Sequence, residues 1–473
     1  MNTAVILGGG IAGLLAGAAA AHHMDSVVIV ERDELSTGPG HRAGVPQAGH
    51  VHALLAAGQR DIDYLVPGFL ATLVGHGATM YDFASDVVLR NTFGWGVRFP
   101  SGIPALGASR ALVEWAIRSH VLDLANVTVL QRHSCIGLVA AADSIAAVRV
   151  SEAGVRAGTE LAADLVIDAT GRGSRADRWL AELGYPQPAV DIIDSGVGYT
   201  SRIYRKPSGH HPDWQACYIQ LGLDERARGA TVMPVEGDRW LITLLSQRSD
   251  HPARTEHEFL RFARSLSSPV VAETIVASEP LTPITASRST SSRRARFSHN
   301  QPRNLVRLGD AACSFNPLYA QGMSAAARSA VLLEQILRHH DPARMALAFQ
   351  RRLALLTLSP WLVATSADAR RPGVSSNIPL YLQRALGRHI DRVQLAGTVD
   401  PHVQHRFIEV FNMLRSPPSL VTPALVARTA RQRPPQEPVP PEPPEPIGAP
   451  KGTERAATRP VAGLSALPRE DLP

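Results

Sequence analysis

Lysine and cysteine are scarce in this chain of 473 residues. Only two of its 48 basic residues, Lys206 and Lys451, are lysines, and the arginines are scattered along the chain. The formal charge of +6 therefore reflects an arginine-rich composition, and we expect no nucleic-acid partner. Three cysteines, Cys135, Cys217 and Cys313, are too few and too far apart for a disulfide framework or a CxxC metal site. We expect a cytoplasmic protein, because thiols stay reduced in that compartment.

Long hydrophobic runs are also rare. The uncharged stretch 4–21 has the length of a short membrane span, but five glycines interrupt it and no basic segment precedes it. The same residues instead predict a strand at 4–7, a glycine turn at 8–13, a helix at 14–23 and a buried strand at 27–30. This order is typical of a Rossmann-like domain, so we expect no membrane span.

The pattern of elements changes twice along the chain. Alternating apolar residues at 197–204 and 240–245 predict an antiparallel sheet, and a parallel-type strand returns at 304–308. We therefore predict an α/β fold with four parts. They are a three-layer Rossmann-like nucleotide-binding domain (1–80, 101–185 and 281–340), an inserted antiparallel-sheet substrate domain (81–100 and 186–280), C-terminal helices (341–430) and a proline-rich tail (431–473). Nine prolines between 431 and 450 favour a disordered or polyproline-like tail, with a docking ligand as the alternative.

The first glycine turn has the GxGxxG spacing of a dinucleotide site. Gly8 permits the tight turn, Gly10 lets the backbone approach a pyrophosphate, and Gly13 lets the helix lie close to the strand. The helix N-terminus then presents free N–H groups to the phosphates. Glu31 ends the second strand, where its carboxylate can accept hydrogen bonds from ribose hydroxyls. These features predict a bound dinucleotide without deciding between NAD and FAD.

A second turn of small residues favours FAD. The strand at 305–308 runs into Gly309 and Asp310, and the segment 316–324 leads into another helix. This arrangement supplies a carboxylate for sugar-like hydroxyls and a second helix N-terminus for an electron-rich ring edge. Two such turns suit a cofactor longer than the adenosine half of NAD.

These residues resemble the class A flavoprotein monooxygenases of the para-hydroxybenzoate hydroxylase type. The motifs that carry the resemblance are the glycine fingerprint with Glu31, Asp168 to Gly171, and Gly309-Asp310 with Pro317 and Gly322. They occur in that family's order, and the resemblance extends from residue 1 to about residue 370. Within the family, segments 42–52 and 168–174 resemble the actinobacterial polyether epoxidases, which epoxidise alkenes of linear polyketide chains.

The resemblance implies FAD as the cofactor and a flavin C4a-hydroperoxide that transfers one oxygen atom of O2. Glu31 would hold the adenosine ribose, Arg110 the pyrophosphate region, and Asp310 the ribityl or pyrophosphate end, while Gly322 and Met323 would present backbone to the isoalloxazine ring. The full set of candidate cofactor residues is Gly8, Gly10, Gly13, Glu31, Arg32, Arg42, Arg110, Asp310, Pro317, Gly322 and Met323.

The electron donor stays open at this point. Family members usually carry Asp-Gly in the middle motif, whereas this chain has Thr170-Gly171. The donor is therefore either NAD(P)H or a separate flavin reductase, and the reductase would be a protein partner.

The sequence contains no constellation of nucleophile and base. Flavin oxygen transfer needs none, because the cofactor carries the chemistry while the protein orients the substrate and excludes water. We expect no catalytic side chain and no metal site, since His50 and His52 lack a third ligand at a convincing spacing. The candidate substrate-pocket residues are Tyr199, Met233, Phe315 and Asn316.

We therefore predict an FAD-dependent monooxygenase acting on a lipophilic natural-product intermediate, with alkene epoxidation as its reaction. The alternatives are aromatic hydroxylation and the reduction of polyprenyl double bonds, as in the geranylgeranyl reductases. A flavin-dependent halogenase is disfavoured, because those enzymes rely on a lysine in the substrate tunnel and a WxWxIP motif. This chain has no WxW, and Lys206 and Lys451 are poorly placed.

Overall fold

The computed structural model describes residues 2–40, 42–155, 157–209, 212–224, 227–247, 250, 253–288, 290–297, 300–433 and 440–447. At its centre lies a five-stranded sheet in the order β20-β11-β1-β2-β7, and every pairing in it is parallel. Its strands are β1 (Thr3–Leu7), β2 (Ser26–Val30), β7 (Val127–Leu130), β11 (Leu165–Asp168) and β20 (Leu305–Arg307). Strands β1, β11 and β20 are short apolar runs with both faces largely buried, as parallel strands require.

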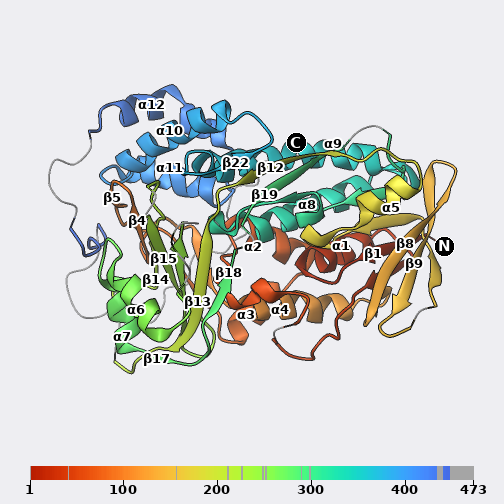
Figure 1. The fold of residues 1–473 in the computed structure, drawn as a ribbon, viewed down its shortest axis with the longest axis horizontal. Coiled ribbons are helices and arrows are strands. Elements are labelled where there is room, and N and C mark those ends of the chain that lie inside the picture. The colour runs from red at the N-terminus through yellow and green to blue at the C-terminus, as the bar shows by residue number, and fades with distance from the viewer. Residues whose placement is uncertain are drawn as a thin grey trace.

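Helices cover one face of this sheet and a smaller sheet covers the other (Figure 1). The helical layer comprises α1 (Ile11–Ala21), α2 (Ala56–Leu65), α3 (Phe69–Gly75), α4 (Arg110–Leu122) and α8 (Gln321–Leu337). The opposite layer comprises β8 (His133–Ala141), β9 (Ser144–Glu152), β10 (Thr159–Ala162) and α5 (Ala176–Glu182). Alternate residues of β1 point into the two layers, with Ile6 in the helical core and Val5 in the other. The predicted three-layer Rossmann-like fold is confirmed.

A second, larger sheet stands beside the first (Figure 1). It has eight strands, named here in chain order: β4 (Val87–Asn91), β5 (Gly94–Trp95), β13 (Gly198–Arg205), β14 (Ala216–Ile219), β15 (Arg228–Val235), β16 (Arg239–Ser246), β17 (Glu279–Pro280) and β18 (Thr285–Ser287). Helices α6 (Glu256–Arg264) and α7 (Val270–Ala277) pack on one face of it. Most pairs are antiparallel, but β4 runs parallel to β14 and so joins the two separated segments of the chain.

The boundaries of the inserted part differ from the predicted ones. Strands β17 and β18 both pair with β13, so the large sheet extends a few residues past position 280. Within the predicted insertion, β12 (Ala189–Asp194) belongs elsewhere, because it pairs with β19 (Ser292–Arg296). Those two strands form a small separate sheet with β21 (Cys313–Ser314) and β22 (Ser375–Ser376). A further pair, β3 (Thr79–Asp82) and β6 (Pro104–Gly107), flanks the first inserted segment.

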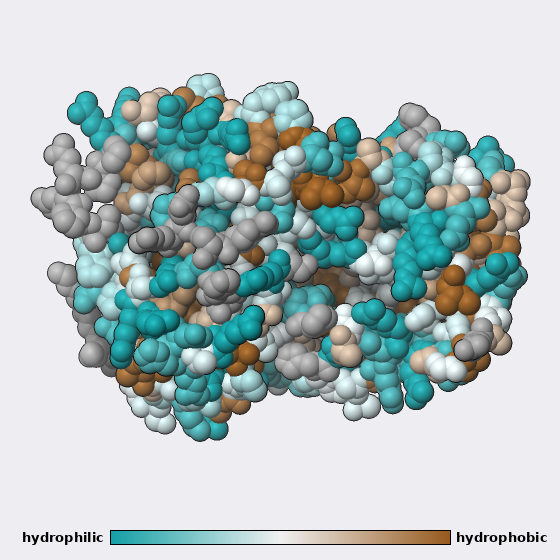
Figure 2. Space-filling model, in the orientation of Figure 1, coloured by the Kyte–Doolittle hydropathy of each residue, from teal (hydrophilic) through white to brown (hydrophobic). Residues whose placement is uncertain are grey.

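The C-terminal part is helical, as predicted. It consists of α9 (Ala346–Asp368), α10 (Tyr381–Ala396), α11 (Pro401–Phe411) and α12 (Pro423–Ala430). Helix α9 packs along α8 and α10, and α10 to α12 lie beyond the edge of the large sheet that carries β5 (Figure 1). Apolar side chains gather over α9 on the surface in Figure 2, and the exposed leucines of that helix are Leu347, Leu355 and Leu358. No helix in the described part of the chain is long and apolar enough to cross a membrane.

Part of the proline-rich tail is docked on the large sheet. The carbonyl oxygen of Pro440 accepts hydrogen bonds from Arg90 Nη1 (2.8 Å) and Trp95 Nε1 (3.1 Å). The Pro444 carbonyl accepts from Arg98 Nη1 (2.9 Å), and the Ile447 N–H donates to the Arg98 carbonyl (2.8 Å). The prediction of a disordered tail is therefore wrong for residues 440–447, while 434–439 and 448–473 lie outside the described residues.

Candidate functional site

Three glycines shape the first turn in the way that the sequence predicts. Gly8 has a φ of +95°, and a Cβ on it would lie 2.8 Å from the Ala169 carbonyl oxygen. A Cβ on Gly13 would lie only 1.8 Å from the carbonyl oxygen of Gly8, so any side chain there would push the helix off the strand. Around Gly10, by contrast, a Cβ would meet nothing nearer than Arg42 Nη2 at 3.9 Å. The bare backbone at Gly10 therefore faces open space at the N-terminus of α1.

That open space is a polar cleft of about 700 Å³, which is within the usual range for ligand sites. It runs from the glycine turn, past the ends of β2 and β11, to the N-terminus of α8. Ten of the eleven predicted cofactor residues line it, namely Gly8, Gly10, Glu31, Arg32, Arg42, Arg110, Asp310, Pro317, Gly322 and Met323. The eleventh, Gly13, lies behind the turn and allows the close packing described above.

Glu31 is held rigidly at the carboxyl end of β2. Its Oε2 accepts a hydrogen bond from the Gly9 N–H (2.7 Å), and its Oε1 accepts from the Asp33 N–H (2.8 Å). Arg42 Nη1 approaches the same carboxylate at 3.2 Å. The side chain is buried on the protein side and lines the cleft, so a ribose would meet a carboxylate that is already oriented.

The cationic side of the cleft depends on Glu114, which the sequence analysis did not single out. This residue of α4 is 4% exposed, and its two carboxylate oxygens contact Arg42 Nε (2.7 Å) and Arg110 Nη2 (3.3 Å). Burial would lower the pKa of Arg42, but the carboxylates of Glu114 and Glu31 more than offset it and raise that pKa. Glu114 therefore holds both guanidinium groups in place for a pyrophosphate.

The second turn closes the other end of the cleft. Asp310 points into the cleft, where enclosure by the walls raises its pKa although Arg172 and Arg110 act against the rise. Helix α8 begins further along the chain at Gln321, after β21 and the turn at 317–319, and has no side-chain cap on its N-terminus. A Cβ on Gly322 would meet nothing nearer than Asp310 Oδ1 at 3.9 Å. The N-terminus of α8 thus offers free N–H groups and bare backbone to a ring edge.

Segment 168–174 stabilises its own turn and contributes one further positively charged side chain to the cleft. Asp168 accepts hydrogen bonds from Thr170 N–H (3.0 Å), Thr170 Oγ1 (2.5 Å) and Ser174 Oγ (2.5 Å), and so it caps its own turn. Arg172, from the same motif, lines the cleft and donates to the Ser291 carbonyl and hydroxyl. Arg172 was not among the predicted cofactor residues, although it lies within segment 168–174.

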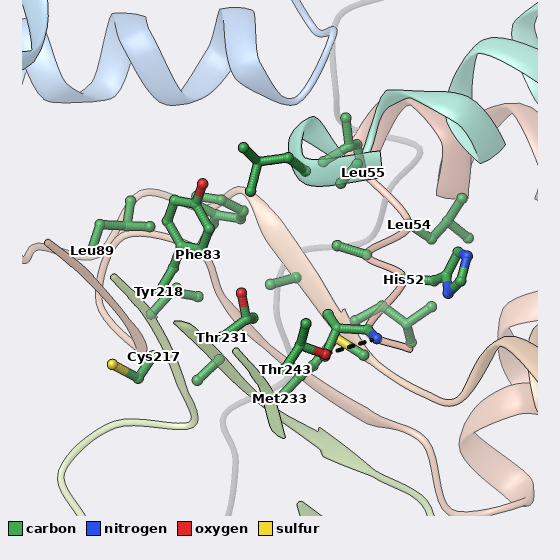
Figure 3. A pocket seen from close by; sticks show the side chains of 18 of the residues that line it. His52, Leu54, Leu55, Phe83, Leu89, Cys217, Tyr218, Thr231, Met233 and Thr243 are labelled. Carbon is green, nitrogen blue, oxygen red and sulfur yellow. Dashed lines mark hydrogen bonds between the residues drawn. The ribbon is translucent and has the colours of Figure 1, made fainter. Parts of the chain in front are cut away.

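An apolar pocket of about 130 Å³ opens beside the cleft (Figure 3). Its walls come from the large sheet, from the 50–55 segment, from the turn at 317–320 and from the end of α11. Figure 3 shows Phe83, Leu89 and Tyr218 on one side and Leu54 and Leu55 on another. A hydrogen bond from the Val51 N–H to Thr243 Oγ1 (3.2 Å) ties the 50–55 segment to the sheet. The pocket is about the size of a cavity that holds a benzene ring.

Of the four predicted substrate residues, three line the apolar pocket or the cleft and one lines neither. Tyr199 and Met233 line the apolar pocket, and Tyr199 also lines the cleft. Phe315 lines the cleft and not the apolar pocket. Asn316 lines neither cavity, which makes it a poor substrate contact. The aromatic residues that the sequence analysis missed in the apolar pocket are Tyr81, Phe83, Tyr218 and Phe411.

Asn316 instead belongs to a buried polar network beside the turn at 317–319. Its Nδ2 donates to both oxygens of Asp368 (3.1 Å each), and Tyr319 OH donates to Asp368 Oδ1 (2.8 Å). Arg371 Nε lies 3.6 Å from the same carboxylate. Burial raises the pKa of Asp368, although Arg371 and the hydrogen bonds oppose that rise. This network fixes the turn at 317–319, which forms a wall of both cavities.

Metal chemistry finds no support in the geometry. Within the described residues, no group of three or more histidine, cysteine, aspartate or glutamate side chains gathers as a metal ion would require. His50 and His52 approach protein groups instead, with His50 Nδ1 2.8 Å from Ser201 Oγ.

Comparison with known proteins agrees with this geometry. Residues 4–183 match the sequence model of the family described as FAD dependent oxidoreductase. The cleft has the features that FAD needs: a bare glycine turn, an oriented carboxylate, paired guanidinium groups and a second helix N-terminus. The chain is therefore an FAD-dependent enzyme of the oxidoreductase class, and FAD is its cofactor.

Similar proteins extend over most of the chain. The Mycobacterium tuberculosis protein Rv3254 is 29% identical over 434 residues, which are 87% of this chain and 90% of that protein. The structure of the flavin-dependent brominase Bmp2 covers 86% of this chain and 92% of its own, with a TM-score of 0.64 and 13% identity. The structure of 2-methyl-3-hydroxypyridine-5-carboxylic acid oxygenase covers 78% of this chain and 92% of its own, with a TM-score of 0.58 and 17% identity. At these identities the structural neighbours establish the fold.

Proposed function

We propose that this protein is an FAD-dependent monooxygenase that inserts one oxygen atom of O2 into an unsaturated, lipophilic natural-product intermediate, and that alkene epoxidation is its reaction. The observation that carries the proposal is the contact between the two cavities. The polar cleft and the apolar pocket share seven lining residues, which are His50, Val51, His52, Ala53, Tyr199, Pro317 and Ala320. A substrate in the pocket therefore lies against the end of the cleft that the α8 N-terminus forms.

Bound FAD, once reduced, supplies the activation of O2 in this scheme. The protein holds the cofactor through the glycine turn, Glu31 and the two arginines on Glu114. The apolar walls of the pocket orient the substrate and exclude water from the oxygen-transfer step. Among the apolar side chains that line the pocket, Leu54 and Leu318 follow shared residues directly in the sequence, and Leu55 follows Leu54.

The described residues favour transfer by the cofactor over side-chain catalysis. Burial raises the pKa of Cys135 and of Cys217 to about 12, so neither thiol near the cavities is a thiolate at neutral pH. Burial lowers the pKa of His50 to about 4, and His50 is therefore uncharged. Electrophilic oxygen transfer to an alkene requires no charged nucleophile.

Halogenation gains no support from the residues, although the fold is shared with a brominase. Lys206 lies outside the lining of both cavities, where its Nζ is 3.7 Å from Asp238 Oδ1 and stacks 4.2 Å from the Trp240 ring. The other lysine, Lys451, lies outside the described residues. The tunnel lysine on which flavin-dependent halogenases rely therefore has no counterpart in the described cavities.

The test is an incubation of the purified protein with FAD, NADPH and a panel of lipophilic alkenes and phenols under heavy-isotope oxygen. One heavy oxygen atom in the product together with loss of the alkene supports epoxidation. A labelled phenol would replace epoxidation by aromatic hydroxylation, and two added hydrogens without label would overturn the proposal in favour of a reductase. Repeating the reaction with an added flavin reductase determines whether NADPH reduces the enzyme directly or through a protein partner.

A further inference from the structure

Three ring-bearing polar residues lie where the two cavities meet. His50, His52 and Tyr199 line both the cleft and the apolar pocket. The His50 ring packs edge-on against Tyr199, with their centroids 4.5 Å apart. The other lining residues of the pocket are mostly apolar, and the remaining polar ones, such as Tyr218, Thr231 and Asn412, do not line the cleft. The three shared rings are therefore the polar side chains that a substrate substituent meets at the junction.

Contacts around His50 fix the position of the next residues. His50 Nδ1 lies 2.8 Å from Ser201 Oγ, and that hydroxyl lies 2.6 Å from Thr243 Oγ1. Thr243 in turn accepts the hydrogen bond from the Val51 N–H. The segment that carries His52 is therefore attached to the middle of the large sheet by consecutive hydrogen bonds. These hydrogen bonds restrict the backbone conformation at His52.

The hydrogen bond that His52 makes determines its tautomer. Its Nδ1 lies 2.9 Å from the His50 carbonyl oxygen, and a carbonyl can only accept, so Nδ1 carries the hydrogen. Nε2 is then the unprotonated nitrogen with a lone pair to offer. Within the described residues, Nε2 has no hydrogen-bond partner. Burial, helped by the nearby charge of Arg110, lowers the pKa of His52 to about 3, so the ring stays neutral and Nε2 remains an acceptor at physiological pH.

We propose that His52 Nε2 accepts a hydrogen bond from a hydroxyl group of the substrate, so that this enzyme acts on unsaturated alcohols rather than on plain hydrocarbons. The unsaturated group would occupy the apolar pocket and the hydroxyl would lie at the junction with the cleft. A ligand without a hydrogen-bond donor would leave Nε2 without a partner, and this lowers the affinity for that ligand. The site therefore selects for ligands that carry a hydroxyl group. This inference rests on the proposed function and makes His52 a positioning residue.

The experiment compares phenol with toluene, which has nearly the same shape but no hydroxyl donor. Binding to the FAD-loaded protein is measured by calorimetry and by the perturbation of the flavin absorbance. His52→Phe is expected to weaken phenol binding about tenfold, the effect of one unmade hydrogen bond, while toluene binding changes less than about twofold. His52→Gln keeps an acceptor and is expected to recover most of the phenol affinity. His257→Phe, at an exposed position of α6, is the matched control and leaves both affinities unchanged.

The outcomes separate this inference from the proposed function. FAD retention and toluene binding show that a variant is folded and that both cavities are intact. Equal phenol affinities in the wild type and in His52→Phe overturn the role of His52 while leaving the monooxygenase proposal in place. A wild-type protein that does not retain FAD refutes the proposed function itself. Preferential loss of phenol affinity, restored by His52→Gln, supports the inference.

Discussion

His50 makes the stability of this protein depend on pH in a predictable direction. The residue is 4% exposed, and burial lowers the pKa of its ring from the ordinary value of 6.5 to about 4. In the unfolded chain the same ring takes up a proton as the pH falls through 6.5, whereas in the folded protein it stays neutral down to about pH 4. Protons then favour the unfolded state, so stability is fully present above pH 6.5 and is lost as the pH falls below it.

The expected size follows from the linkage relation. One pH unit across this window costs about 1.4 kcal/mol per proton, so lowering the pH from 6.5 to 5 removes about 2 kcal/mol from the free energy of unfolding. His50→Gln keeps a group that can hydrogen-bond Ser201 but cannot titrate. The variant is expected to be about 2 kcal/mol less sensitive to this change of pH than the wild type.

The assay is urea unfolding of the FAD-saturated proteins at pH 7.5, 6.5 and 5, followed by tryptophan fluorescence. Constant slopes of free energy against urea show that the folded and unfolded states remain comparable. The difference between wild type and variant isolates His50 from the other groups that titrate in this range. Equal losses in both proteins would refute the burial of a neutral His50 at the junction.

Three further predictions concern the cofactor turn, the buried network and the tail. Gly13→Ala places a Cβ 1.8 Å from the Gly8 carbonyl oxygen, so we expect the purified variant to lose FAD, as read from its absorbance spectrum. The control is Gly38→Ala at a half-buried position, where a Cβ would meet no atom within 4 Å, and FAD retention is expected to stay unchanged. Asp368→Asn leaves the buried guanidinium of Arg371 without its carboxylate, so we expect the free energy of unfolding in urea to fall by about 3 kcal/mol. The control Glu160→Gln breaks an exposed ion pair and is expected to lower it by less than about 1 kcal/mol. Deleting 434–473 removes the carbonyl groups that Arg90, Trp95 and Arg98 contact. We expect this deletion to lower the free energy of unfolding by on the order of 2 kcal/mol and to speed hydrogen exchange in β4 and β14. Deleting 448–473 alone is the control and is expected to change neither quantity.

The sequence was most informative where function depends on local backbone. Three parts of the site depend on a few consecutive residues each: the turn at residues 8–13, the acid at the end of β2 and the N-terminus of α8. The spacing of these residues in the sequence therefore predicts the local geometry directly. Helix α4 shows the same local causation, because it begins at Arg110 directly after Ser109, whose Oγ accepts a hydrogen bond from the Leu112 N–H (3.1 Å). Such features are predictable because the cause and the effect lie within one turn of chain.

Residues brought together by long-range folding escaped prediction. In the sequence, Glu114 is an ordinary acidic residue of an amphipathic helix, and it acquires its role only because the 42–45 loop folds over that helix. Phe411 reaches the apolar pocket from a helix more than 160 residues beyond Met233, so no spacing rule connects them. Asn316 was misplaced for the converse reason, since its neighbours in sequence face the cavities while its own side chain turns toward Asp368.

The position of β1 within the central sheet sets the order in which this protein can be completed during synthesis. Of the five strands of this sheet, β1 is synthesised first and lies in the middle, whereas β20 is synthesised last and begins only at residue 305. The walls of the cleft are complete only when residue 326 is available, and the apolar pocket waits for residues 411 and 412. A nascent chain must therefore keep its early apolar strands from aggregating through some three hundred residues of synthesis, and capture of the cofactor is a late event in its folding.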